Sequence, residues 1–210
     1  MGSVDWYFDF ISPFAYLQHE QLGRLPQDAT VNFRPVLFGV LLDHWGAKGP
    51  AEIPPKRRFT FRHVQWQADR LGIPLKFPPR HPCNPLLPLR LAIALGREHA
   101  AIATIFRFIW AEGMDLDDPQ AWRELCARLG VKDIDAVIGT PEVKAGLRAS
   151  CDSAIAAGVF GVPTSIVDGE LFWGADATQM LIDWLARPES LDTPEMRRVS
   201  DLPYGARRKG

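Results

Sequence analysis

Hydrophobic and polar positions at the start of the chain predict two strands separated by a helix. Residues 4–11 read as a buried strand, and residues 30–37 alternate apolar and polar positions as a second strand. Between them, residues 14–25 carry apolar side chains at helical spacing. This β-α-β order is the unit of a parallel sheet.

The middle of the chain changes to a mostly helical pattern. Residues 39–55 hold several Gly and Pro residues and predict a loop or a short helix. A helix is expected over 54–72, with proline at its start and Gly72 at its end, and then a proline-rich extended cover over 72–88. Further helices are predicted at about 86–98, 99–112, 119–129, 133–138 and 141–157, two of them opened by Asp118-Pro119 and Thr140-Pro141 as N-cap and first-turn proline.

A second β region follows Gly158. Residues 163–169 predict a strand that ends in Asp-Gly, the signal for a type I′ hairpin, and residues 170–174 predict the return strand. Residues 175–187 carry a helical apolar face. The remaining tail has proline, charge and little periodicity, so we expect it to be extended or partly disordered.

The element order is therefore βαβ, then mostly helices, then ββα. The two β-containing parts can pair into one four-stranded mixed sheet, which is the thioredoxin arrangement with a helical insertion. We predict an α/β fold in which residues 1–38 and 158–190 form the thioredoxin-like domain. Residues 39–157 are then the helical insertion domain, and residues 191–210 are a C-terminal tail.

Composition and charge remove several classes of function. The chain has 210 residues, a net charge of −1 and a pI of about 6.5, so no basic excess favours nucleic acid or an anionic membrane. No stretch approaches the roughly 18 apolar residues of a spanning helix. No basic and apolar leader precedes the first strand, and a cytoplasmic location is expected.

The other chemistry-bearing residue types give weak signals. The three cysteines are far apart, form no CxxC pair and have no ligand-like spacing with histidine, so we expect buried thiols, no disulfide framework and no metal. His44, His63 and His81 are interpreted as surface or packing residues rather than bases. Lys56 and its two arginine neighbours are read as a solvated helix face, with attraction of a substrate carboxylate as the alternative.

Ser12 and Pro13 stand at the turn between the first strand and the helix. In a thioredoxin-like sheet this turn lies at the amino end of a helix, where free N–H groups and the helix dipole favour a negative group. Redox relatives place CxxC here, but the four residues in this chain are Ser-Pro-Phe-Ala. Ser12 is either a helix N-cap or a hydroxyl that donates a hydrogen bond to the sulfur of a bound thiol.

Val162 and Pro163 directly precede the strand of the ββα part. In thioredoxin-like folds a cis-proline lies there, facing the turn after the first strand, and the preceding backbone pairs with an extended peptide. A simple proline at the entry to a strand is the other interpretation. Glutathione, a short peptide with a thiol, fits a site that offers a backbone edge at Val162 and a hydroxyl at Ser12.

The order of these motifs resembles that of the 2-hydroxychromene-2-carboxylate isomerases, a branch of the DsbA-like thioredoxin superfamily close to the kappa-class glutathione transferases. The opening "VDWYFDFISPFAYL", the middle segments "LGIPLKFP" and "NPLLPLRLAIAL", and the closing "TPEVKAGLRASCDSAIAAGVFGVPTSIVDGELFWGAD" carry the resemblance, from about residue 4 to 187. It implies a bacterial enzyme of aromatic catabolism, as in naphthalene degradation, with glutathione as cofactor and a small aromatic carboxylate as substrate. The implied reaction is reversible addition of the glutathione thiolate to a conjugated alkene, rotation about the former double bond, and elimination.

The resemblance also implies roles for individual residues. Ser12 corresponds to the serine that contacts the glutathione sulfur, with Pro13 beside it, and Val162-Pro163 to the backbone-pairing dipeptide. Asp176 corresponds to the acid of a "WGxD" motif that binds the γ-glutamyl end, although an acid at a helix start is also common without a ligand. Asn84 corresponds to an asparagine near the active site, or is a turn residue before Pro85.

Three positions depart from the family pattern. Ala177 follows Asp176 in the expected cofactor-binding segment, where relatives often carry an arginine, and its side chain cannot bind a carboxylate. His63 gives "FRHVQW" where "LRDL"-like text is common, and Leu42 stands where the well-studied isomerases carry a lysine near the cofactor. These departures bear on the substrate more than on the fold.

Other functions remain open beside the isomerase. A kappa-like glutathione transferase that conjugates small electrophiles would use the same cofactor site but would consume glutathione. Thiol-disulfide exchange is disfavoured because Ser12 and Ala15 leave no thiol at the turn. A glutathione-binding module without catalysis would leave the thiolate-favouring turn unused. Relatives of this kind are commonly dimeric, so a homodimer is expected.

Overall fold

A four-stranded mixed sheet forms the centre of the molecule. The computed structural model describes residues 2–206, and the strands are β1 (Ser3–Phe8), β2 (Thr30–Pro35), β3 (Thr164–Val167) and β4 (Glu170–Trp173), in the order β2-β1-β3-β4. β1 pairs in parallel with β2, while β3 lies antiparallel to both β1 and β4. The sheet confirms the pairing of the βαβ and ββα parts that the sequence predicts.

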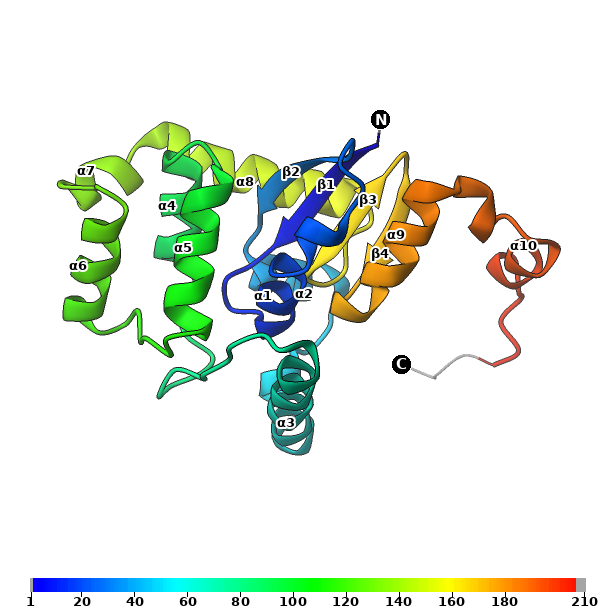
Figure 1. Ribbon diagram of the computed structural model, residues 1–210, viewed down its shortest axis with the longest axis horizontal. Helices are drawn as coiled ribbons and strands as arrows, with labels where there is room; N and C mark the ends of the chain where they lie inside the picture. Colours follow the sequence, from blue (N-terminus) through cyan, green and yellow to red (C-terminus); the bar gives the residue numbers. More distant parts are fainter. Residues whose placement is uncertain (1, 207–210) are drawn as a thin grey trace.

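Helices cover both faces of this sheet. Figure 1 shows α1 (Pro13–His19) and α9 (Thr178–Ala186) in front of the strands and α8 (Pro141–Ala156) behind them. The short 3-10 turns η1 (Leu22–Arg24) and η3 (Ala175–Ala177) follow α1 and precede α9. This three-layer arrangement is the predicted α/β thioredoxin-like fold.

The insertion between the halves is helical, as predicted. In Figure 1, α3 projects below the sheet, and α4 to α7 gather at the side of the molecule beyond β2. The predicted and observed helices agree to within a few residues at most ends, and the bounds are α2 (Phe38–Trp45), η2 (Pro50–Glu52), α3 (Pro54–Leu71), α4 (Leu86–Ala94), α5 (His99–Trp110), α6 (Pro119–Arg128) and α7 (Ile134–Ile138).

Local sequence signals explain several of these boundaries. The side chains of Asp118 and Thr140 accept hydrogen bonds from the backbone N–H of Gln120 and Val143, so each caps the helix that the following proline starts. Asp168 and Gly169 both have positive φ, 50° and 87°, as a type I′ turn requires. The predicted caps and hairpin are therefore confirmed.

The hydrophobic core runs through both the sheet and the insertion. Trp6, Phe8 and Phe10 from the β1 segment pack in one continuous cluster with Phe106 and Trp110 of α5. The Trp110 indole N–H also donates to the backbone carbonyl of Phe10, at 2.9 Å and fully buried. The insertion is thus packed on the sheet directly beneath the turn that carries Ser12.

The tail is more regular than the sequence analysis expects. It contains a 3-10 turn, η4 (Pro188–Leu191), and a helix, α10 (Pro194–Ser200). The expectation of an extended or disordered tail is wrong for these segments, because Thr193 caps α10 by accepting from the Met196 N–H and Pro194 opens it. Of the predicted tail, residues 207–210 lie outside the described residues.

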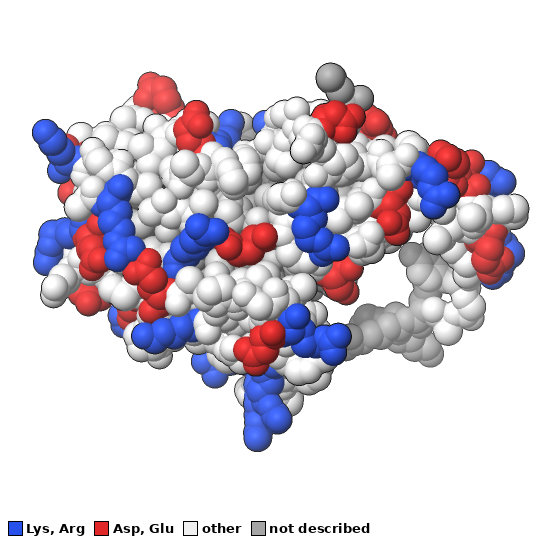
Figure 2. All heavy atoms as spheres, in the orientation of Figure 1, with Lys and Arg blue, Asp and Glu red and all other residues white. Residues whose placement is uncertain are grey.

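Charges of both signs are spread over the surface. Figure 2 shows Lys and Arg side chains interspersed with Asp and Glu over the visible face, in keeping with the net charge of −1. Within residues 2–206, no helix is both long and apolar enough to cross a membrane.

Candidate functional site

Ser12 lies at the carboxyl end of the β1 segment and joins two parts of the site. Its hydroxyl oxygen accepts from the Ala15 N–H at 3.2 Å, which makes it the N-cap of α1. The same hydroxyl lies 3.3 Å from the Val162 carbonyl oxygen, to which it donates. Ser12 is therefore a cap and also faces the dipeptide that precedes β3, so its two interpretations are compatible.

The Val162-Pro163 peptide bond is cis, as expected for a thioredoxin-like fold. The Pro163 carbonyl accepts from the Gly174 N–H at 2.9 Å, and this bond ties the proline segment to the "WGAD" turn. At Gly161 a Cβ atom would lie 2.5 Å from the Trp173 indole nitrogen, so only glycine leaves room for this ring over the loop. The "FGVP" and "WGAD" motifs thus form one packed unit.

A cavity of about 450 Å³ opens above Ser12; we call it the main cavity. The predicted residues Ser12, Pro13, Val162 and Asp176 line it together, although they lie up to 164 residues apart, between 12 and 176, in the sequence. Residues of α2, η2 and α3 line the rest of the main cavity, so the insertion supplies the wall opposite the Ser12 turn. Pro163 and Ala177 are not among the lining residues.

Asp176 sits in the turn that leads from β4 into α9. Gly174 before it has a φ of 94°, which favours glycine, and a Cβ there would meet the Asp176 carboxylate. Asp176 is exposed, and within the described part of the chain its carboxylate has no hydrogen-bond or ion-pair partner. Its carboxylate is therefore free to bind a cation on a ligand.

Asn84 takes the turn role that the sequence analysis offers as the alternative. Its side-chain oxygen accepts from the Leu86 N–H at 3.0 Å at the start of α4, and the residue is exposed. It does not line the main cavity. A role for Asn84 near the active site stays a prediction from the resemblance.

The main cavity contains a histidine that the sequence analysis interprets only as a surface or packing residue. His81 lines it, packed among the rings of Phe61, Phe77 and Trp110. Burial, with the positive charge of Arg57 second, lowers the pKa of His81 to about 4, so the imidazole is neutral at pH 7. The His81-Pro82 bond is also cis, and no sequence signal distinguishes this pair from the other dipeptides of the proline-rich stretch.

Asp9 is a second residue that the sequence analysis misses. Its fully buried carboxylate accepts from the Ile11 N–H at 3.1 Å and from the Phe38 N–H at 2.8 Å. Because Ile11 and Phe38 both line the main cavity, Asp9 joins the Ser12 turn to the start of α2. Burial outweighs these hydrogen bonds and raises the pKa of Asp9 to about 7.

Two of the three departures from the family pattern fall at the site. Leu42 and His63 both line the main cavity, and His63 packs against Phe14. Lys48 and Lys56 also line it, with Glu52 between them in sequence. The cavity thus keeps two lysines near its rim, although a leucine stands at position 42.

The three cysteines are free thiols, and none of them lines the main cavity. Burial, with the Asp9 charge second, raises the pKa of Cys83 to about 12, and burial also raises the pKa of Cys126 and Cys151. High pKa values disfavour the nucleophilic thiolate. Across residues 2–206, no group of three or more His, Cys, Asp or Glu side chains is arranged to hold a metal ion.

Comparison with family models decides where the chain belongs. The model of the DSBA-like thioredoxin domain matches residues 3–186, which includes both halves of the sheet and the whole insertion. The chain belongs to the DSBA-like thioredoxin domain family. The predicted family membership is thereby confirmed. This chain lacks the CxxC cysteine pair that thiol-disulfide exchange proteins of this fold carry at the turn after the first strand.

Curated relatives and a solved structure agree with the resemblance that the motifs show. A 2-hydroxychromene-2-carboxylate isomerase of Sphingobium xenophagum is 30% identical over 87% of this chain and 97% of its own length. A kappa 2 glutathione S-transferase of Caenorhabditis elegans is 28% identical over 88% of this chain and 92% of its own. The solved structure of a 2-hydroxychromene-2-carboxylate isomerase superposes with a TM-score of 0.78 at 25% identity, covering 96% of this chain and all of the other.

Proposed function

We propose that the protein is a glutathione-dependent isomerase that acts on an intermediate of 2-hydroxychromene-2-carboxylate type. One observation carries the proposal: the Ser12 hydroxyl lies 3.3 Å from the Val162 carbonyl on the wall of a 450 Å³ cavity. The relatives named as such isomerases span nearly the whole chain. The proposed product is the open-chain trans-benzylidenepyruvate.

The residues at this site fit glutathione as the cofactor. A sulfur placed beside Ser12 would meet a hydroxyl donor, and an extended cysteinyl backbone would lie along the Val162 edge. The unpaired Asp176 carboxylate suits the ammonium group of the γ-glutamyl end. When bound, glutathione supplies the thiolate that attacks the substrate alkene and leaves again, so it is not consumed.

The chain itself would provide orientation and charge. Ser12 has one hydroxyl proton, so in the complex it would turn from the Val162 carbonyl toward the sulfur and favour the thiolate. Aromatic walls, which include Phe38, Phe61 and Trp173, suit an aromatic ring. Lys48 and Lys56 would attract the substrate carboxylate, and the neutral His81 offers a ring nitrogen for a hydroxyl group.

A kappa-like transferase is the second candidate, favoured by the relatives of that name. It would use the same cofactor contacts and differ in the fate of the thiol, which would end as a stable thioether. Cytoplasmic location and a homodimer stay predictions from the sequence.

Titration with reduced glutathione, followed by turnover of 2-hydroxychromene-2-carboxylate, tests the proposal. We expect saturable binding, product formation that requires glutathione, and a thiol concentration that stays constant through many turnovers. Loss of one thiol per product would instead establish the transferase, and no binding at millimolar glutathione would overturn both.

Ser12→Ala tests the role of the hydroxyl. The substitution should raise the pKa of the bound glutathione thiol, measured by thiolate absorbance, because the hydrogen-bond donor to the sulfur is lost. An unchanged titration would show that Ser12 acts only as the N-cap of α1.

A further inference from the structure

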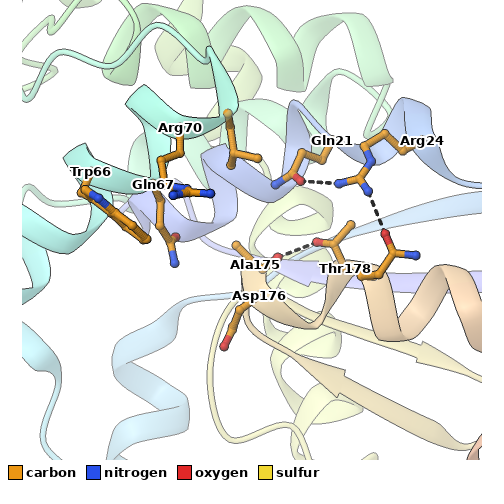
Figure 3. Close-up of a pocket in the computed structure, with 10 residues that line it drawn as sticks. Gln21, Arg24, Trp66, Gln67, Arg70, Ala175, Asp176 and Thr178 are labelled. Atoms are coloured by element: carbon orange, nitrogen blue, oxygen red, sulfur yellow. Dashed lines mark hydrogen bonds between the residues drawn. The ribbon is translucent and has the colours of Figure 1, made fainter.

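Among the described residues, two histidines line the main cavity, and they differ in what their ring nitrogens already bind. His63 lies on α3, and its Nε2 accepts a hydrogen bond from the side-chain amide of Gln67 at 3.1 Å. Gln67 also lines a second cavity of about 300 Å³, where Figure 3 shows it across from Ala175 and Asp176. His63 therefore belongs to the Asp176 end of the main cavity, and one of its nitrogens is occupied.

The side chain of His81 has no such partner within residues 2–206. Its Nδ1 is enclosed and forms no hydrogen bond, whereas Nε2 is not enclosed and is likewise without a hydrogen-bond partner. Because the half-buried His81 lines the main cavity, Nε2 is the ring nitrogen that a ligand in the cavity can meet. A buried polar group of this kind gains a full hydrogen bond when a ligand supplies the missing partner.

The imidazole of His81 is held by its neighbours. Its ring centre lies 5.2 Å from that of Phe61 and 5.3 Å from that of Trp110. The Arg57 guanidinium donates to the His81 carbonyl at 3.0 Å and stacks on Phe61, 4.5 Å from the centre of that ring. Nε2 is therefore presented from a fixed position beside the aromatic ring of Phe61.

Charge separates this part of the main cavity from the rest of its lining. The carboxylates and ammonium groups that line the cavity belong to exposed residues, namely Lys48, Glu52, Lys56 and Asp176. The imidazole of His81 is neutral at pH 7, because burial and the charge of Arg57 lower its pKa to about 4. A neutral imidazole pairs with a hydroxyl group, which both donates and accepts, but gives no attraction to a carboxylate.

We propose that His81 determines substrate specificity by a hydrogen bond between its Nε2 and the hydroxyl group next to the alkenyl side chain on the aromatic ring of the open-chain compound. The inference rests on the proposed function, in which the substrate carboxylate is drawn to the exposed lysines. The aromatic end of the substrate then lies toward Phe61 and His81. An aromatic substrate without this hydroxyl would leave Nε2 unpaired and bind less tightly.

Two compounds that differ by one hydroxyl group test this assignment. The first is trans-2-hydroxybenzylidenepyruvate, the proposed product, and the second is trans-benzylidenepyruvate. Calorimetric titration without glutathione, so that no thiol adds to either compound, should show about tenfold tighter binding of the hydroxyl compound to the unaltered protein. His81→Phe keeps an aromatic ring in the same packing and should abolish this ratio by weakening only the hydroxyl compound.

Two further variants keep the test specific. His81→Gln retains a hydrogen-bonding group and should recover part of the ratio between the two affinities. His63→Phe makes the same change at the other histidine of the main cavity and should leave the ratio as it is in the unaltered protein.

The outcomes separate this assignment from the proposed function. Equal loss of both affinities in His81→Phe would show that the ring only shapes the cavity, and equal binding of the two compounds by the unaltered protein would show that the hydroxyl is not recognised. Either result overturns the assignment and leaves glutathione dependence untouched. No binding of either compound would overturn the proposed function and this assignment with it.

Discussion

At the scale of single residues, Asp9 holds the site together at an electrostatic cost. Its carboxylate is fully buried and receives only backbone N–H donors, so its pKa is raised from 3.8 to about 7. Between these two values the native chain binds a proton that the unfolded chain has released. Stability from this group is therefore fully present below pH 3.8 and is lost progressively as the pH rises from there through 7.

Asp9→Asn should remove this pH dependence, because an amide does not titrate. We expect the free energy of unfolding of the unaltered protein, minus that of the variant, to fall by about 2–3 kcal/mol between pH 5 and pH 8. Urea denaturation at half-unit pH steps measures both curves. Parallel curves over this range would show that the native carboxyl titrates near its ordinary pKa.

The residues at the turns beside the main cavity were easier to predict than the residues packed behind them. Ser12 and Val162-Pro163 stand at turns whose place in the fold follows from element order, so their facing positions could be expected. Asp9 looked like an ordinary polar residue of a strand end, and His81 like one of several histidines. Their burial depends on packing between the sheet and the insertion, which element order does not determine.

At the scale of elements, capping residues set the ends of the helices. α8 leads from the insertion back to the Gly158–Pro163 segment, and it begins where the Thr140 hydroxyl accepts from the Val143 N–H at 3.3 Å. The same Thr-Pro signal at Thr193 starts α10, where weak periodicity hid the helix. In short exposed segments, a capping residue followed by proline therefore predicts a helix better than hydrophobic periodicity does.

Thr140→Ala should lower the free energy of unfolding by about 1 kcal/mol, since it leaves the Val143 N–H without its cap. Thr104→Ala is the matched control, because Thr104 lies half-buried inside α5 and its hydroxyl bonds only back to the Ala100 carbonyl. The control should change stability by less than about 0.5 kcal/mol. Equal losses in urea denaturation for the two variants would contradict a capping role.

At the scale of the whole molecule, the thioredoxin-like part and the insertion share one core. The ring of Phe106 on α5 contacts five rings that all belong to the βαβ part, namely Trp6, Phe8, Phe10, Tyr16 and His19. The sequence analysis assigns residues 39–157 to a helical insertion domain. Continuous packing couples this insertion to the sheet, so a single hydrophobic core supports the walls of the main cavity.

This shared core predicts a single unfolding transition. Phe106→Ala should lower the free energy of unfolding by about 3–5 kcal/mol, because it opens a cavity between α5 and the sheet. Far-ultraviolet circular dichroism and tryptophan fluorescence should still report coincident transitions. Phe59→Ala makes the same change on α3, where the ring is 66% exposed, and should cost little. Two separate transitions, with Phe106→Ala shifting only one of them, would show that the insertion folds as an independent domain.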